Sequence, residues 1–237
     1  MAEATDDSEL VGLDPFDMFD REAARLDAYF STLADDDWAR PSRCEAWTVR
    51  DVLAHLLAAE GYFHACLDGT VAEFDAQVAA KGGTDLHRGN AILIAELAGQ
   101  EPAQLLAEWR VANAETRRGF RERGDGTVDT SVGEYPCRWQ ALHIASELAT
   151  HADDVGVPIT PEERDARLAW RARVSRFALA ETKPDITISV ESGRTRVRRD
   201  DLEVDVDDEE VIEGVAARLD ATSRLDAPAR ALLSAMP

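Results

Sequence analysis

WQALHIASELATHADDVGVP, residues 139–158, is the segment around which we expect the rest of the chain to pack. At about 100° per residue, a helix here places His143, Glu147 and His151 on one side. Side chains four residues apart can reach one metal ion from one helix face, which is why helical zinc motifs use this spacing. The three residues span about 12 Å of helix, too far for all of them to bind the same ion. Either Glu147 with His151 or His143 with Glu147 is the sterically sensible pair, and a tetrahedral site then needs a ligand from another helix.

A histidine that can supply this ligand lies in an earlier apolar segment, TVRDVLAHLLAAEGYFHACLDG (48–69). His55 is flanked on both sides by alanine and leucine, so it belongs near a buried helix face and not in a solvated cluster of charges. A lone histidine in such a place is commonly a core residue hydrogen-bonded to a neighbour. The later helix that carries histidine and glutamate makes a shared metal site the competing interpretation.

Composition predicts an acidic globular protein with a substantial core. Of the 237 residues, 45% are apolar and 31% are charged, and the net charge is −21. A surface this acidic repels phosphate groups, which argues against nucleic acid or an anionic membrane as a partner. Arginine supplies 24 of the 26 basic residues, a bias typical of GC-rich genomes.

The cysteines and the first residues predict a cytoplasmic location. Cys44, Cys66 and Cys137 are odd in number and no two have metal-ligand spacing, so we expect reduced thiols. Cys66 or Cys137 could be a nucleophile, but neither has a neighbouring base that the sequence identifies, which favours buried or idle thiols. MAEATDDSEL (1–10) lacks the basic start and apolar stretch of a secretion signal, and no apolar run approaches the roughly 18 residues of a membrane span.

Hydrophobic periodicity predicts a helical bundle followed by a smaller mixed unit. After a disordered acidic tail at 1–12, we expect helices over 14–34, 48–69, 71–80, 89–123 (interrupted at 99–102) and 139–156. Four main apolar stripes bury one another naturally as a four-helix bundle. A helix at 160–182 precedes the alternating segments ITISV, RTRVR and LEVDV, which predict an antiparallel sheet, and two short helices at 208–219 and 226–235 close the chain. The predicted domains are 1–160 and 161–237.

Two of these segments resemble a known family. RCEAWTVRDVLAHL (43–56) and ELATHADDVGVP (147–158) are similar to the two signatures of mycothiol-dependent maleylpyruvate isomerases, which belong to the DinB-like superfamily. The resemblance implies a mainly α protein, with a DinB-like four-helix bundle followed by a small α+β C-terminal domain. It also implies a divalent metal ion, usually zinc, held by His55, Glu147 and His151, and so selects Glu147 with His151 over His143 with Glu147. The residues after 211 follow the family's C-terminal pattern only loosely, which leaves the substrate open.

The resemblance further implies a mycothiol-dependent isomerase or thiol S-transferase acting on a small electrophile. The metal-activated thiolate would add to a conjugated double bond, the resulting single bond would rotate, and elimination would release the product. Arg50 and Arg138 are candidates for binding the cosubstrate or a dicarboxylate substrate, with a plain surface role as the alternative. His143 would either hydrogen-bond a ligand or substrate, or pack in the bundle. A metal-dependent hydrolase and a non-catalytic ligand-binding bundle are the competing functions, and the chain is expected to be a monomer or homodimer.

Overall fold

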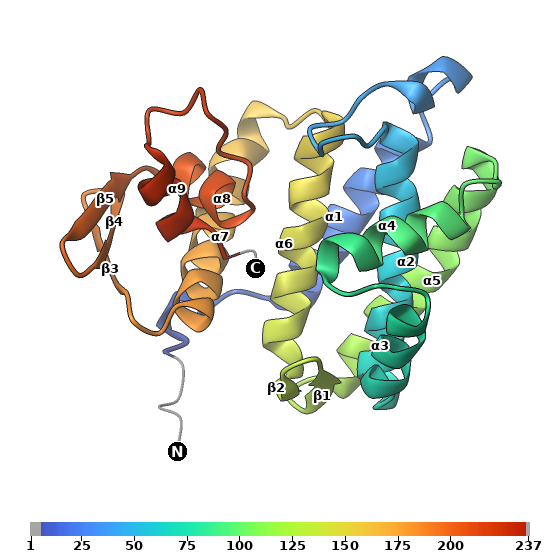
Figure 1. The fold of residues 1–237 in the computed structure, drawn as a ribbon, viewed down its shortest axis with the longest axis horizontal. Helices are drawn as coiled ribbons and strands as arrows, with labels where there is room; N and C mark the ends of the chain where they lie inside the picture. The colour runs from blue at the N-terminus through green and yellow to red at the C-terminus, as the bar shows by residue number, and fades with distance from the viewer. Residues whose placement is uncertain (1–5, 236–237) are drawn as a thin grey trace. The chain divides into compact units, whose positions relative to one another are not determined.

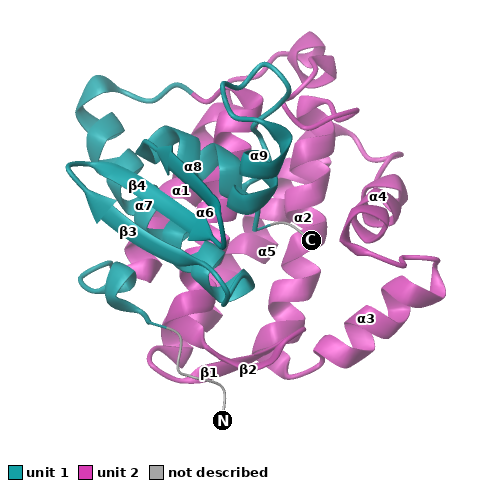
Figure 2. Ribbon diagram, turned by 60° about the vertical axis from the view of Figure 1, so that its left-hand side comes forward, with its two compact units in different colours: residues 1–13, 158–237 teal, residues 14–157 magenta. Residues whose placement is uncertain are grey.

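The computed structural model describes residues 6–235, which divide into two compact units. Residues 14–157 form one unit, and residues 158–235 join residues 6–13 in the other (Figure 2). We expected domains over 1–160 and 161–237. The division after residue 157 lies close to that boundary, but the N-terminal segment groups with the second unit. Among the described residues, no helix has both the length and the apolar character needed to cross a membrane.

The first unit is a four-helix bundle (Figure 1). α1 packs against α6 and α2 packs against α5, while two shorter helices, α3 and α4, lie in the connection between α2 and α5. The bounds are α1 (Pro15–Phe30), α2 (Val49–Asp68), α3 (Val71–Ala80), α4 (Leu86–Glu96), α5 (Pro102–Arg123) and α6 (Cys137–Val155). The predicted mainly α bundle is confirmed.

Aromatic residues at helical spacing fill the bundle core. Phe19 and Phe30 of α1 are 1% exposed, and Trp109 and Phe120 of α5 are equally buried. The ring of Phe30 stacks on Trp38 and meets Trp109 edge-on at a centroid distance of 6.2 Å. Burying several such rings is a large favourable contribution to folding, which explains why this stripe forms core and not a binding site.

A short hairpin before α6 was not predicted. β1 (Thr127–Thr130) pairs antiparallel with β2 (Gly133–Pro136), in a stretch for which the sequence predicted no strand. Each strand has four residues, too few for a clear alternating pattern. Gly133, with φ 99°, allows the tight reversal that a residue with a side chain would resist. The hairpin carries Tyr135 to the start of α6.

The second unit packs three helices on one face of a small antiparallel sheet. The strand order is β3-β4-β5, as the alternating segments predicted. Val197, Val204 and Val206 point inward to a core shared with Leu179 and Leu233. The bounds are α7 (Pro161–Thr182), β3 (Thr187–Glu191), β4 (Arg194–Arg199), β5 (Leu202–Val206), α8 (Asp208–Val215) and α9 (Ala227–Leu233).

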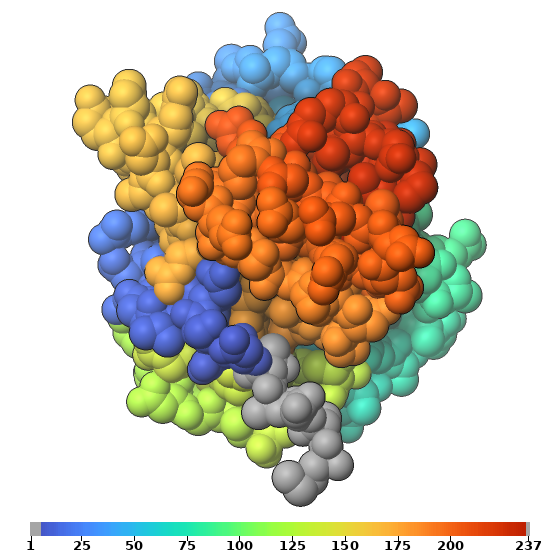
Figure 3. Space-filling view, turned by 90° about the vertical axis from the view of Figure 1, so that its left-hand side faces the viewer, coloured from blue at the N-terminus to red at the C-terminus, as the bar shows by residue number. Residues whose placement is uncertain are grey.

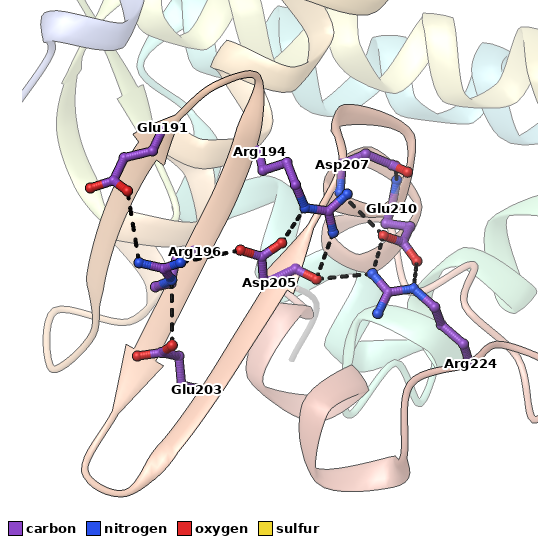
Figure 4. A network of polar contacts seen from close by, with 8 residues as sticks. All are labelled: Glu191, Arg194, Arg196, Glu203, Asp205, Asp207, Glu210 and Arg224. Atoms are coloured by element: carbon purple, nitrogen blue, oxygen red, sulfur yellow. Dashed lines mark hydrogen bonds and ion pairs between the residues drawn. The ribbon is translucent and has the colours of Figure 1, made fainter.

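The outer face of this sheet carries arginines that are matched by carboxylates (Figure 4). Arg196 lies 3.3 Å from Glu203 and 3.5 Å from Asp205, and Arg194 pairs with the same aspartate. This part of the chain faces the viewer in Figure 3, where the sheet is orange. Exposed pairs of this kind add little stability each. Because these arginines are neutralised by carboxylates, we do not regard the face as an anion-binding surface.

The N-terminal segment is ordered where we expected a disordered tail. Ser8–Leu10 forms a 3₁₀ turn whose Leu10 is 8% exposed. Arg176 on α7 donates from Nε and Nη2 to the two oxygens of the Glu9 carboxylate, at 2.7 and 2.9 Å. A bidentate pair around a buried arginine outweighs the local acidic composition that suggested disorder. Residues 1–5 of the predicted tail lie outside the described residues.

A buried carboxyl group joins α2 to α5. Glu60 is 2% exposed and accepts a hydrogen bond from Asn113 Nδ2 at 2.9 Å. Its other oxygen meets the Thr116 hydroxyl, which also lies 3.2 Å from the Ala112 carbonyl. A hydroxyl has one hydrogen for these two acceptors, so both contacts are satisfied when Glu60 is protonated and donates to Thr116. Burial raises the pKa of Glu60 to about 7.

This carboxyl predicts a loss of stability as pH rises. Below pH 4.5, the ordinary pKa of glutamate, Glu60 is protonated in both the folded and unfolded states. Between 4.5 and about 7 only the unfolded chain releases the proton, so the free energy of unfolding should fall by up to about 3 kcal/mol. Urea unfolding of metal-free protein from pH 4.5 to 8 measures this change. Glu60→Gln should flatten it relative to wild type, whereas exposed Glu115→Gln should not. Parallel pH profiles for wild type and Glu60→Gln would contradict the assignment.

Candidate metal centre

The start of α2 is fixed by a reciprocal cap that sets the position of His55. Thr48 Oγ1 accepts from the Asp51 N–H at 3.2 Å, and Asp51 Oδ2 accepts from the Thr48 N–H at 2.9 Å. This capping box satisfies two backbone donors and defines the first turn. His55 follows about two turns later. In the preceding loop, Trp47 lies over the His55 ring with a centroid distance of 5.1 Å.

Three predicted ligands converge between α2 and α6. His55 Nε2 lies 3.1 Å from Glu147 Oε1, and the rings of His55 and His151 are 4.8 Å apart between centroids. One ligand atom from each of the three residues lies within 4.8 Å of the others. Both histidines are 6% exposed, while Glu147 is half-buried. The geometry therefore joins Glu147 and His151, and not His143 and Glu147, with the histidine of α2.

Asp154 fixes the orientation and tautomer of His151. Its Oδ2 atom lies 3.0 Å from His151 Nδ1 and accepts a hydrogen bond from the Cys44 thiol at 3.1 Å. An ionised carboxylate can only accept, so Nδ1 carries the proton and the lone pair of His151 is on Nε2. This is the arrangement in which an imidazole offers its second nitrogen to a metal ion.

The charge states of the site suit a cation. Burial lowers the pKa of His151, which keeps its imidazole neutral and able to donate a lone pair. Burial alone would raise the pKa of Glu147, but the His55 hydrogen bond together with weaker electrostatic contributions outweighs it and lowers the pKa of that carboxyl. Neutral imidazole with ionised carboxylate is a donor set that zinc accepts.

Cys44, His151 and Asp154 form a second group whose ligand atoms lie close together. The thiol sulfur is 3.9 Å from His151 Nδ1. The two groups share His151, and Asp154 already occupies the Nδ1 side of its ring. We therefore assign Cys44 and Asp154 to supporting contacts behind the His55–Glu147–His151 set.

The other predicted site residues have defined contacts of their own. His143 Nε2 lies 3.0 Å from the Tyr135 hydroxyl, one helical turn before Glu147. Arg50 donates from Nη2 to the carbonyls of Leu97 and Gln100 at the end of α4. These contacts give Arg50 a structural role, and its predicted role in binding a cosubstrate or dicarboxylate stays a prediction.

Arg138 likewise makes structural contacts. Its guanidinium carbon lies 5.5 Å from the centre of the Phe16 ring, and a nitrogen lies 3.6 Å from Asp125. Arg121 approaches the same ring at the same distance. The predicted role of Arg138 in cosubstrate or substrate binding stays a prediction.

Sequence reasoning did not assign roles to Cys44, Trp47, Glu60 or Asp154. Asp154 had a usable signal, because it lies three residues after His151 on the same helix and such pairs are neighbours. Cys44 and Trp47 reach the site through an irregular loop, where sequence spacing does not determine distance.

Comparison with known proteins identifies the family and the fold of the first unit. Residues 19–156 match the sequence profile of the mycothiol maleylpyruvate isomerase N-terminal domain. Two crystal structures of the mycothiol-dependent maleylpyruvate isomerase, one of them a point mutant, are also similar. Each is 16% identical in sequence to this chain with a TM-score of 0.50, and each alignment covers 71% of this chain and 68% of the matched chain. No curated protein matches the sequence.

At this identity the structural likeness shows the fold alone, but the profile match covers more than half of the chain. It includes His55, both residues of the Glu147/His151 pair and the supporting Asp154. The chain therefore belongs to the mycothiol maleylpyruvate isomerase N-terminal domain family.

Proposed function

We propose that this protein holds a divalent metal ion with His55, Glu147 and His151 and uses it to activate mycothiol for attack on a small electrophile. The convergence of the three side chains between α2 and α6 carries this proposal, because both histidines are buried there. Buried polar groups are costly unless a partner compensates them, and a shared cation is such a partner. Two imidazoles and one carboxylate fit zinc best, although other divalent ions accept the same donors.

Three protein ligands leave one coordination position for a reactant, which is the pattern of catalytic sites and not of structural ones. Bound zinc would lower the pKa of a thiol enough to give thiolate near neutral pH. The protein side chains would supply what the ion does not. Asp154 would hold His151 in the binding tautomer, and Trp47 would cover the His55 ring and limit water on that side.

The nucleophile is proposed to come from outside the protein. All three cysteines are buried. Burial raises the pKa of Cys66 and of Cys137 to about 11, so neither forms thiolate readily at neutral pH. The Cys44 thiol donates a hydrogen bond to Asp154. Because the protein's own thiols are poor nucleophiles, a small thiol cosubstrate fits the site, and the family points to mycothiol.

Thiol dependence tests the reaction. Purified, zinc-loaded protein should isomerise maleylpyruvate, or transfer the thiol to another electrophile, only when mycothiol is present, because the reaction passes through addition of the thiol. Ultraviolet absorption follows loss of the conjugated substrate. Hydrolysis of an activated ester or amide without added thiol would instead support a metal-dependent hydrolase.

Removing His55 should abolish metal binding. Zinc affinity of His55→Ala, measured by competition with a chromogenic chelator, should fall more than about 100-fold, beyond the range typical of outer contacts. His64→Ala is the matched control, since His64 lies on the same helix and contacts the Ala112 carbonyl at 3.2 Å. Its affinity should stay close to wild type. Wild-type affinity in His55→Ala would remove His55 from the site.

Removing the charge of Asp154 should weaken the site without destroying it. Asp154→Asn loses the carboxylate that holds His151 Nδ1, and its zinc affinity should fall by about 10- to 100-fold. Asp125→Asn, at a side chain that is 91% exposed, is the control and should bind as wild type does. Cys44→Ser keeps a hydroxyl that can donate a hydrogen bond to Asp154, so its zinc affinity should stay close to that of wild type. Unchanged affinity in Asp154→Asn would show that His151 does not need this support.

A further inference from the structure

Tyr135 and His143 form a polar pair that the metal site does not use. The Tyr135 hydroxyl lies 3.0 Å from His143 Nε2, and both residues are half-buried. Tyr135 is held by an edge-on contact with Trp139 at 5.8 Å between centroids. A phenol is the better donor and a neutral imidazole nitrogen the better acceptor, so Tyr135 donates to Nε2. The pair is thus a hydroxyl already hydrogen-bonded to a base.

The pair lies beside the metal centre along α6. Trp139, His143, Glu147 and His151 follow one another at four-residue intervals, which makes them a continuous row on one side of the helix. Neighbours in such a row have Cβ atoms about 5–6 Å apart. His143 therefore lies one helical turn from the proposed ligand Glu147, on the same side of α6.

We propose that the Tyr135–His143 pair takes the proton that mycothiol loses when it becomes a thiolate. The S–H bond breaks, the electron pair stays on sulfur, the Tyr135 oxygen accepts the proton and the Tyr135 hydrogen moves to His143 Nε2. When the thiol leaves after elimination, the same proton returns to sulfur. No other reactant is consumed. This inference rests on the proposed function and names the base that the function requires.

Two features of the pair suit this task. Histidine is the side chain that most often serves as a general base in enzymes. The Tyr135 hydroxyl is already hydrogen-bonded to His143 Nε2, so a proton can pass between them without movement of either ring.

A proton inventory tests the pair without relying on turnover. Cobalt-loaded protein is mixed with mycothiol at pH 7, thiolate binding is followed by the sulfur-to-cobalt absorption band, and released protons are counted with a pH indicator. Wild type should release clearly less than one proton per thiolate, because His143 retains part of it. His143→Gln should release close to one, since the metal-driven ionisation of the thiol then delivers its proton to the buffer. His64→Gln is the control and should behave as wild type does.

The outcomes separate this inference from the proposed function. Absence of the sulfur-to-cobalt band in wild type would count against thiol activation itself. A normal band with equal proton release in wild type and His143→Gln would overturn the role of the pair alone. Tyr135→Phe should retain stoichiometric cobalt but bind thiolate at least about tenfold more slowly in stopped-flow mixing. An unchanged rate in that variant would remove Tyr135 from the transfer.

Discussion

The first unit depends on placing imidazole and carboxylate groups inside an apolar bundle. His55 and His151 are each 6% exposed, and the Trp47 ring lies against both of them. Leaving such groups without partners costs several kcal/mol, so each must be hydrogen-bonded or bound to a cation. Asp154 provides a partner for one nitrogen of His151, and Glu147 lies against Nε2 of His55. Asp154 thus satisfies Nδ1 of His151, while one ligand atom from each of His55, Glu147 and His151 lies close enough to the others to share a metal ion.

Local backbone signals bring the two helices into the required register. The Thr48–Asp51 capping box fixes where α2 begins, and Gly156, with φ 78°, ends α6 two residues after the aspartate that supports His151. A backbone hydrogen bond of 2.9 Å from the Arg43 N–H to the Asp154 carbonyl ties the loop before α2 to the end of α6. The start of α2, the end of α6 and this loop contact therefore together determine where the site residues lie.

The sequence was most informative where a pattern repeats over many residues. The periodic segments at 48–69 and 139–158 predicted the helices that carry the cluster, and the alternating valines of 194–206 predicted the sheet. Spacing alone left His143 and His151 as alternatives, because only tertiary packing decides which turn of α6 faces His55. The four-residue strands of the hairpin are too short to show a period. The N-terminal segment is ordered by one distant residue, Arg176, which local composition cannot reveal.

X-ray absorption at the zinc edge tests most directly which atoms hold the metal ion, and it is measured on zinc-loaded protein without thiol. We expect one zinc per chain bound only by nitrogen and oxygen at about 2.0–2.1 Å, with imidazole scattering from two histidines. A sulfur ligand at about 2.3 Å would place the ion at Cys44, His151 and Asp154 instead. That result, or failure to retain stoichiometric zinc, would contradict the account.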